Sequence, residues 1–189
     1  NIKKPFVFYP AQFWAHKNHV SIIEALAWLR DTKKIVIYGY FVGSDKGNLE
    51  YVKCAIKKYN LEKQVFILGF VKYPELRYLY KNALAMVYVS LLGPNNLPPL
   101  EAAALSCPVI ISNIPGHLEQ MGKVGLFVNA FVPQDIGRAI VALYKNPKRY
   151  QKLISSGSVL VKKYKNYSYF QEMLRVIAQY ALQHKTWAG

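Results

Sequence analysis

Acidic residues and cysteines are scarce in this chain. Its 189 residues contain 10 Asp and Glu against 25 Lys and Arg, a net charge of +15. The 2 cysteines, Cys54 and Cys107, have no C-x-x-C spacing, so we expect small apolar residues in a reducing compartment. No apolar run approaches the roughly 20 residues of a membrane-spanning helix. The positive charge favours an anionic partner such as a nucleotide, a nucleic acid or an acidic membrane surface, although lysines that only solvate helix faces would produce the same excess.

Several motifs of nucleotide and hydrolase sites are also absent. No G-x-G-x-x-G follows the first apolar run and no G-x-x-x-x-G-K-[ST] occurs, which disfavours a dinucleotide site and excludes a P-loop protein. The chain lacks a D-x-D pair, the usual metal-bridging acids for nucleotide-sugars, and it lacks a G-x-S-x-G nucleophile elbow. His16 and His19 are spaced i,i+3 without a third ligand nearby, so no metal site is expected.

Short apolar runs alternate with helical patterns along most of the chain. The pattern predicts strands at residues 6–9, 34–38, 65–68, 85–89, 108–112 and 125–128. It predicts helices at residues 19–31, 49–59, 74–82, 98–105, from 133 onward, 148–163 and 167–183. Apolar strands separated by helices indicate a parallel sheet covered on both faces. The predicted fold class is therefore α/β, a Rossmann-like doubly wound parallel sheet of about six strands with C-terminal helices.

Ligands of such folds bind beyond the carboxyl ends of the strands. We therefore expect the functional loops at residues 10–18, 39–47, 69–74, 90–98 and 112–122. Residues 1–146 are predicted to form the sheet domain and residues 147–189 a helical appendage. Because the first predicted strand begins only a few residues from the start, we expect the chain to be a fragment of a longer protein.

The segment Ser90–Cys107, SLLGPNNLPPLEAAALSC, follows a predicted strand and enters a helix at Pro98 and Pro99. Glu101 is expected in the first turn of that helix. Helix amides can hold phosphate and a carboxylate can hold sugar hydroxyls, but an acid there also stabilises the helix dipole by about 0.3–1 kcal/mol with no ligand. A second acid, Glu119, is expected in a loop.

The loop PAQFWAHKNH places Lys17 and Asn18 at the start of the next predicted helix. A cation beside free helix amides favours a diphosphate, whereas a solvated lysine beside an asparagine cap is the alternative. Phe13 and Trp14 are expected to pack within the protein and not to stack on a nucleotide base. The apolar loop at residues 69–74 could wall a nucleotide base or merely close the sheet.

Taken together and in order, these motifs resemble the C-terminal, donor-binding domain of the GT-B retaining glycosyltransferases of family four, the glycosyl transferases group 1. The loop PAQFWAHKN is similar to G-R-L-x-x-x-K-[GN], and VFILGFVKYPELRYLY is similar to v-x-f-l-G-x-v-x-x-x-e-L-x-x-l-Y. The hallmark S-x-x-E-G-F-G-L-P-x-L-E-A corresponds to SLLGPNNLPPLEA, and P-V-[IV]-x-S corresponds to PVIIS. The similarity runs from about Phe6 to Tyr180.

The resemblance implies roles for individual residues. Lys17 would bind the donor diphosphate and Glu101 would accept hydrogen bonds from the ribose, which makes these two the expected catalytic residues. The resemblance implies no metal and no cofactor. The expected substrate-binding residues come from three loops: Gln12, Asn18, Gly69, Phe70, Val71, Pro74, Gly93, Asn95, Asn96, Leu97 and Pro98.

Two departures from the family pattern stand in the expected site. The first glutamate of the paired motif aligns with Gly93, and the loop arginine aligns with Gln12. We expect Asn95 and Asn96 to replace the missing glutamate by hydrogen bonding the sugar, since an amide is both donor and acceptor.

The resemblance implies the donor-binding half of a retaining glycosyltransferase of polysaccharide, lipopolysaccharide or glycan synthesis, with residues 1–146 as the nucleotide-sugar-binding domain. The donor would be a UDP- or GDP-linked sugar, and an N-terminal domain outside this sequence would hold an acceptor glycan or lipid-linked sugar. We expect a cytoplasmic protein, inactive as this isolated domain, that can associate with the inner face of an anionic membrane and does not bind nucleic acid. The alternatives are a basic nucleic-acid-binding α/β domain and a non-catalytic interaction domain with a degenerate donor site.

Overall fold

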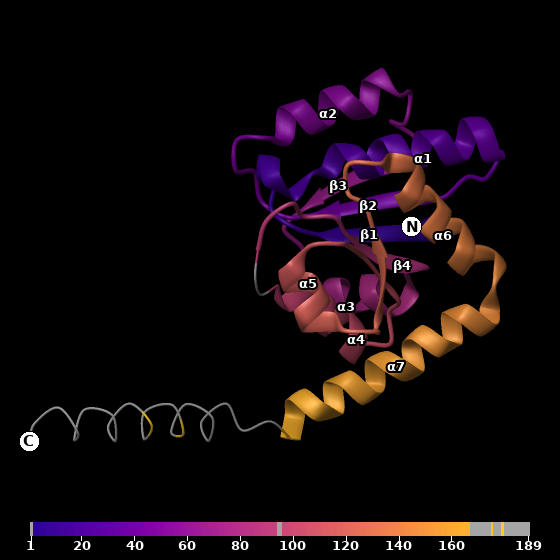
Figure 1. Ribbon diagram of the computed structural model, residues 1–189. Coiled ribbons are helices and arrows are strands. Elements are labelled where there is room, and N and C mark those ends of the chain that lie inside the picture. The colour runs from indigo at the N-terminus through magenta and orange to yellow at the C-terminus, as the bar shows by residue number, and fades with distance from the viewer. Residues whose placement is uncertain (1, 94–95, 167–174, 176–178, 180–189) are drawn as a thin grey trace, which may run out of the picture.

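The structure is a computed structural model that describes residues 2–93, 96–166, 175 and 179. Its centre is a single six-stranded sheet in the order β3-β2-β1-β4-β5-β6 (Figure 1). All neighbouring strands are parallel. The strands are β1 (Phe6–Pro10), β2 (Tyr38–Val42), β3 (Val65–Gly69), β4 (Ala85–Tyr88), β5 (Val109–Ser112) and β6 (Gly125–Val128). The predicted Rossmann-like, doubly wound sheet is confirmed.

Helices cover both faces of the sheet. They are α1 (His19–Lys33), α2 (Leu49–Lys58), α3 (Tyr73–Asn82), α4 (Leu97–Ala104), α5 (Pro115–Met121), α6 (Pro133–Lys145) and α7 (Pro147–Asn166). Figure 1 shows α1 and α2 on one side of the sheet, and α3, α4 and α5 on the other. Helix α6 packs on α1, and α7 packs on both α4 and α6. This two-sided cover explains why the strands are continuous apolar runs.

Both faces of the central strand β1 carry buried aromatic rings. Phe8 packs edge-on against Tyr80 of α3 with ring centroids 4.8 Å apart. Tyr9, on the opposite face, lies 4.7 Å from the ring of His19 in α1. Because alternate residues of a strand point to opposite faces, β1 joins the two helical layers into one core.

The second strand differs from its prediction. Residues 34–38 were expected to form it and Gly39 to end it, but β2 begins at Tyr38 and contains Gly39. Lys34 instead closes α1 in the left-handed conformation, with φ of 55°. The amide of Ile35 then donates to the carbonyl of Leu29 at 3.1 Å, so the first apolar residues of the run complete the helix end.

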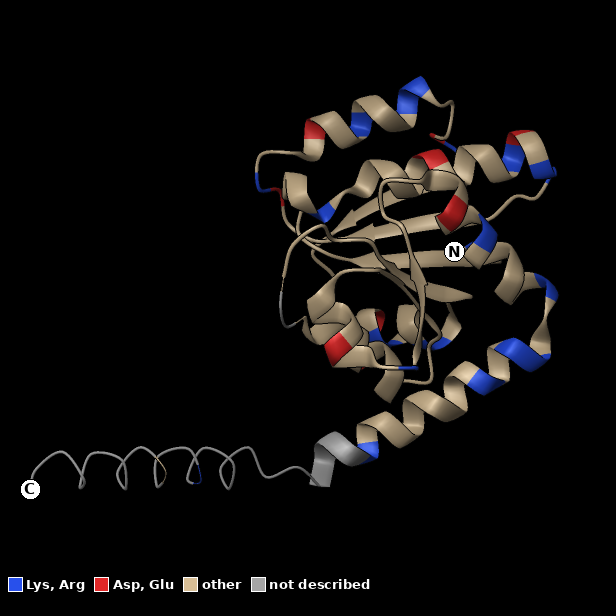
Figure 2. Cartoon of the chain, viewed as in Figure 1, with Lys and Arg blue, Asp and Glu red and all other residues tan. Residues whose placement is uncertain are grey.

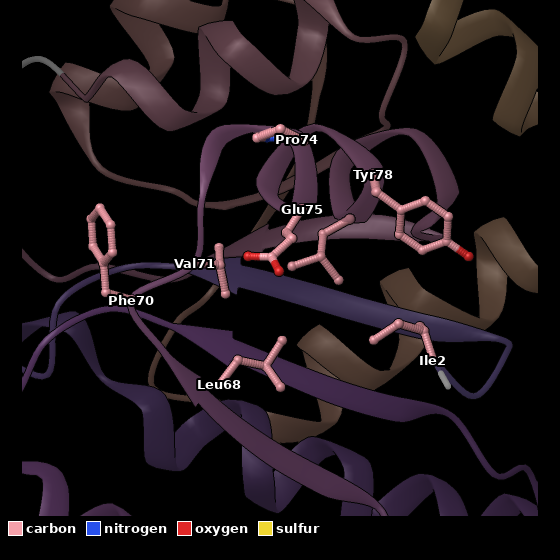
Figure 3. Close-up of a pocket in the computed structure, with 8 residues that line it drawn as sticks. Ile2, Leu68, Phe70, Val71, Pro74, Glu75 and Tyr78 are labelled. Atoms are coloured by element: carbon pink, nitrogen blue, oxygen red, sulfur yellow. The ribbon is translucent and has the colours of Figure 1, made fainter.

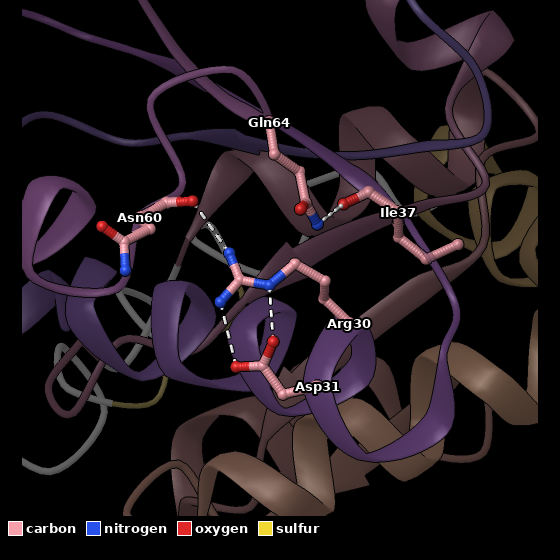
Figure 4. Close-up of polar contacts among 5 residues, drawn as sticks. All are labelled: Arg30, Asp31, Ile37, Asn60 and Gln64. Carbon is pink, nitrogen blue, oxygen red and sulfur yellow. Dashed lines mark hydrogen bonds and ion pairs between the residues drawn. The ribbon is translucent and has the colours of Figure 1, made fainter.

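Side-chain hydrogen bonds hold this helix end against the start of β3 (Figure 4). Buried Gln64 donates through Nε2 to the carbonyl of Ile37 at 2.8 Å. Arg30 donates to the carbonyl of Asn60 at 2.8 Å and to Asp31 at 2.6 Å. The backbone before β2 therefore has partners outside the sheet ladder, which sequence periodicity does not reveal.

Two further predictions near the expected site are wrong. Residues 112–122 were expected as a loop, but Pro115–Met121 form α5, and Glu119 lies exposed on it. This helix is short and buries the polar residues His117 and Gln120, so it lacks the apolar period that marks a helix. Helix α4 begins at Leu97, which puts Glu101 in its second turn instead of the first.

The helical part beyond residue 146 is described as far as Asn166. Ala103 of α4 lies against Gly157 of α7, where an added Cβ would be 3.4 Å from Ala103. The second predicted helix, residues 167–183, lies almost wholly outside the described residues, so the division at residue 146 stays a prediction. Within the described part of the chain, no helix combines the length and apolarity that a bilayer crossing needs.

Candidate functional site

The strand order reverses between β1 and β4. From β1 the chain builds the sheet in one direction through β2 and β3, and from β4 it builds the other through β5 and β6. In open α/β sheets the loops that leave such a switch point form a ligand crevice. Here the two loops touch, because the amide of Leu91 after β4 donates to the carbonyl of His16 after β1 at 2.8 Å.

Lys17 lies at this switch point. It ends a short 3₁₀ helix, Ala15–Lys17, and the hydroxyl of Tyr9 donates to its carbonyl at 2.7 Å. Its Nζ donates to the hydroxyl of Tyr88 at 3.0 Å and lies 5.2 Å from the Tyr88 ring centroid. Partial burial lowers the pKa of the Lys17 ammonium. A half-desolvated cation of this kind is stabilised by an anionic ligand.

The neighbouring residues Asn18 and Gln12 make contacts within the protein. Asn18 is left-handed, with φ of 56°, and its amide donates to the carbonyl of Ala130 at 2.9 Å. Its Oδ1 accepts from Ser21 at 2.8 Å. Gln12 is exposed and accepts from the indole of Trp14 at 3.0 Å. Asn18 therefore fixes the loop that carries Lys17, and it uses both polar atoms of its side chain to do so.

Glu101 is exposed on α4 and is fixed by a buried tyrosine of α3. The hydroxyl of Tyr80, whose side chain is 1% exposed, donates to Glu101 Oε2 at 2.8 Å. Among the described residues, no group donates to the other carboxylate oxygen. One oxygen is thus held while the other can accept from a ligand hydroxyl.

The turn between β4 and α4 is built around Asn96, which is only 8% exposed. Its Oδ1 accepts from Tyr88 at 2.7 Å, and its Nδ2 lies 2.9 Å from His117 Nε2 and 3.2 Å from the Gly93 carbonyl. A Cβ at Gly93 would lie 2.9 Å from that Nδ2. Asn96 therefore fills the space beside Gly93 and its amide is bonded within the protein, while the contact of that amide with a sugar stays a prediction. Asn95 lies outside the described residues.

The loop after β3 presents backbone and apolar side chains. Gly69 has φ of 66°, and Phe70 is 88% exposed. A cavity of about 610 Å³ runs beside this loop, between α3 and the edge of the sheet (Figure 3). Its lining residues are Ile2, Leu68, Phe70, Val71, Pro74, Glu75, Tyr78 and Leu79. Since Ile2 precedes β1, the cavity runs away from the switch point, and only its Phe70 end is placed to meet a ligand there.

Among the predicted residues, the structure brings Lys17 and Asn96 into one hydrogen-bonded group through Tyr88. The structure shows no contact between Lys17 and Glu101. At the start of α4, Leu97 is 71% exposed and Pro98 is half-buried.

Three functional candidates are visible only in the structure: Tyr80, Tyr88 and His117. The available signal was a tyrosine at the end of the apolar run AMVYV, because a buried tyrosine hydroxyl needs a partner.

The aromatic residues of the first loop divide between core and surface. Phe13 is buried and stacks on His19 with ring centroids 4.5 Å apart, which confirms its predicted packing. Trp14 is 43% exposed, and its ring stacks on His16 with ring centroids 6.3 Å apart. Within the residues the structure describes, His, Cys, Asp and Glu side chains form no group of three or more that could hold a metal ion.

Comparison with known proteins relates this arrangement to one family. The family model of the glycosyl transferases group 1 matches residues 1–159. The chain is 32% identical over 119 residues to the O-antigen chain mannosyltransferase RfbU of Salmonella typhimurium, which covers 61% of this chain and 32% of that protein. The chain thus spans about a third of the length of this curated relative.

Solved structures share the fold. HepE of Anabaena, crystallised with UDP and glucose, has a TM-score of 0.75 and 18% identity over 84% of this chain and 43% of its own. The C-terminal domain of the group 1 glycosyl transferase LpcC of Francisella tularensis has a TM-score of 0.72 and 22% identity over 85% of each chain. The chain described here belongs to the glycosyl transferases group 1 family.

Proposed function

We propose that this chain binds a nucleoside diphosphate sugar at the β1–β4 switch point and is the donor-binding half of a retaining glycosyltransferase. The observation that carries the proposal is the Lys17 ammonium, held at the switch point by Tyr88 at 3.0 Å. The family and the UDP bound by the structurally similar HepE support it.

Each part of the donor has a candidate partner. Lys17 binds the diphosphate as a compact cation, through the two N–H groups that it does not donate to Tyr88. Glu101 accepts from the ribose hydroxyls through the carboxylate oxygen that Tyr80 leaves free. The backbone at Gly69 to Val71 meets the base, because Gly69 has open space beside it.

The proposed reaction transfers the sugar to an acceptor with retention of configuration. The departing diphosphate gains negative charge as the glycosidic bond breaks, and a preorganised cation such as Lys17 stabilises that charge without reorganisation. The relationship to RfbU supports a role in surface polysaccharide synthesis. We propose that the acceptor, a glycan or lipid-linked sugar, is held by a part of the protein outside this sequence, so that residues 1–189 alone transfer no sugar.

Calorimetric titration with UDP, GDP, ADP and CMP tests the donor site. We expect one of the nucleoside diphosphates to bind, and we expect Lys17→Ala and Glu101→Ala each to weaken it by about tenfold, the loss of a charge-assisted hydrogen bond. Lys57→Ala and Glu62→Ala remove the same charges from exposed positions elsewhere and are the controls. Equal binding by all four variants would contradict the site.

We also propose that α7 associates with an anionic membrane at the inner face. Its exposed basic residues include Lys148, Arg149, Lys152 and Lys162, and no acid lies between Pro147 and Asn166. Figure 2 shows this basic helix beside a domain that carries acids on its other helices. Such a segment would hold the enzyme near lipid-linked acceptors.

A further inference from the structure

The hydrogen bonds at Lys17 continue into the interior as a relay. Lys17 Nζ bonds the Tyr88 hydroxyl at 3.0 Å, and that hydroxyl bonds Asn96 Oδ1 at 2.7 Å. Asn96 Nδ2 bonds His117 Nε2 at 2.9 Å, and His117 Nδ1 lies 2.9 Å from Ser112 Oγ. We call these five residues the switch-point relay. They come from the ends of β4 and β5, the starts of α1 and α4, and helix α5.

The deep end of the relay fixes the direction of its hydrogen bonds. Ser112 Oγ donates its only proton to the carbonyl of Ser90 at 2.6 Å. His117 must then carry its proton on Nδ1, which donates to Ser112, and its Nε2 must accept. Burial lowers the pKa of His117, which keeps the ring neutral. Asn96 therefore turns its NH₂ group toward His117 and its Oδ1 away.

The direction of the hydrogen bonds at the outer end of the relay follows from their direction at the inner end. Asn96 Oδ1 has only lone pairs to offer, so the Tyr88 hydroxyl donates to it. The Tyr88 oxygen then has a lone pair free to accept from the Lys17 ammonium. Among the described residues, the ammonium has no other hydrogen-bond partner, and it keeps two N–H groups for a ligand.

A flexible lysine loses side-chain entropy when a ligand fixes it, and a lysine that is already held in place loses less of it on binding. On this basis we infer that Tyr88 and Asn96 are positioning residues of the donor site: they hold the Lys17 ammonium where the diphosphate binds. This inference rests on the proposed function. In this inference the buried Asn96 positions the Lys17 ammonium and does not contact the sugar.

Gly93 is required by the same arrangement. It has φ of 127°, and a Cβ there would lie 2.9 Å from Asn96 Nδ2. Any other residue at position 93 would displace the amide that connects Tyr88 to His117.

A double-mutant cycle with Lys17 distinguishes aiming from general structural support. Tyr88→Phe should weaken UDP or GDP binding by about tenfold when Lys17 is present and by less than about twofold in the Lys17→Ala background. Asn96→Leu, which removes the amide but keeps the volume, should behave the same way. Tyr78→Phe, at an exposed tyrosine of α3, is the matched control. Equal losses in both backgrounds, or no loss in either, would overturn the inference.

A ligand-free measurement separates failure of this inference from failure of the proposed function. If the wild-type chain bound neither UDP nor GDP, the proposed function would fail, but NMR titration of the Lys17 ammonium would still test the relay. Loss of the Tyr88 acceptor disfavours the charged form, so Tyr88→Phe should lower the pKa of Lys17 below its wild-type value. Identical titration in both proteins would contradict the relay.

Discussion

The hydroxyl of Tyr80 holds the carboxylate of Glu101 in place. It is buried against Phe8 and donates to Glu101 Oε2 at 2.8 Å. Tyr80→Phe keeps the packing and releases the carboxylate, so affinity for UDP should fall about fivefold to tenfold. Affinity for 2′,3′-dideoxyuridine diphosphate, which lacks the ribose hydroxyls, should not change. Calorimetry with both ligands checks this, and an equal loss for both would mean that Tyr80 does not act through ribose recognition.

His19 is a buried residue that makes the domain acid-labile. Its side chain is 0% exposed, and neither ring nitrogen makes a hydrogen bond of ordinary geometry with a described residue. Burial lowers the pKa of His19 to about 4, with the Ala11 carbonyl opposing part of the shift. The unfolded chain thus binds more protons between pH 6.5 and 4. Stability is full above pH 6.5 and falls as the pH drops toward 4, by on the order of 3 kcal/mol.

Substitution of His19 by phenylalanine tests this account. His19 stacks on Phe13 at 4.5 Å, so a second apolar ring fits the same stack and removes two buried polar atoms. We expect His19→Phe to be more stable at pH 7 by about 1–3 kcal/mol. We also expect a flatter fall in the free energy of unfolding between pH 6.5 and 4. Urea unfolding across that range measures both, and identical slopes in the two proteins would refute the assignment.

Packing between elements depends on one glycine in α6. A Cβ at Gly137 would lie 2.6 Å from the Trp28 ring of α1. Gly137→Ala gains helix propensity but forces α6 away from α1, and overpacking of this kind costs about 1–3 kcal/mol. We expect a net loss of stability in thermal unfolding. Gln134→Ala, at an exposed position of the same helix, should have little effect, and a stabilised Gly137→Ala protein would show that the interface is loose.

The elements that the sequence predicts best are those with continuous apolar cores. The strands β1, β3, β4, β5 and β6 lie within about one residue of their predicted bounds, because each is a continuous apolar run between helices. The strand predicted at KIVIY begins four residues before β2, because Lys34 at the start of this run closes α1. Helix α5 was missed because it buries His117 and Gln120, whose partners come from other elements.

The site follows the same rule. Lys17 could be predicted because it precedes a helix in the loop after the first strand. The proposed positioning roles of Tyr88 and Asn96 could not be predicted. The bond of Tyr88 to Lys17 depends on the β1–β4 pairing, and the bond of Asn96 to His117 depends on the placement of α5. The burial of Asn96, which is 8% exposed, could likewise not be predicted from the sequence.

At the scale of the whole molecule, the net charge of +15 is expected to hold the protein on a membrane through the basic residues of α7 and not through basic residues elsewhere. Replacing Lys148, Arg149 and Lys152 of α7 by glutamate should abolish sedimentation with anionic vesicles at low salt, since each basic residue contributes about 1 kcal/mol near such a surface. Neutral vesicles should retain neither protein, and about 0.5 M salt should release the wild-type chain. The same change made at Lys53, Lys57 and Lys58 of α2 is the control. Equal loss in both triple variants would assign the binding to overall charge.

The central claim is that a nucleoside diphosphate occupies the β1–β4 switch point with its diphosphate at Lys17. NMR titration of the ¹⁵N-labelled chain with UDP and GDP maps the bound ligand onto the backbone directly. The account predicts that the largest shifts fall at residues 12–18, 69–71 and 90–101, and that Lys17→Ala needs about ten times more ligand to produce the same shifts. Shifts confined to α7 or to the cavity beside Ile2 and Tyr78, or an unchanged affinity in Lys17→Ala, would contradict it.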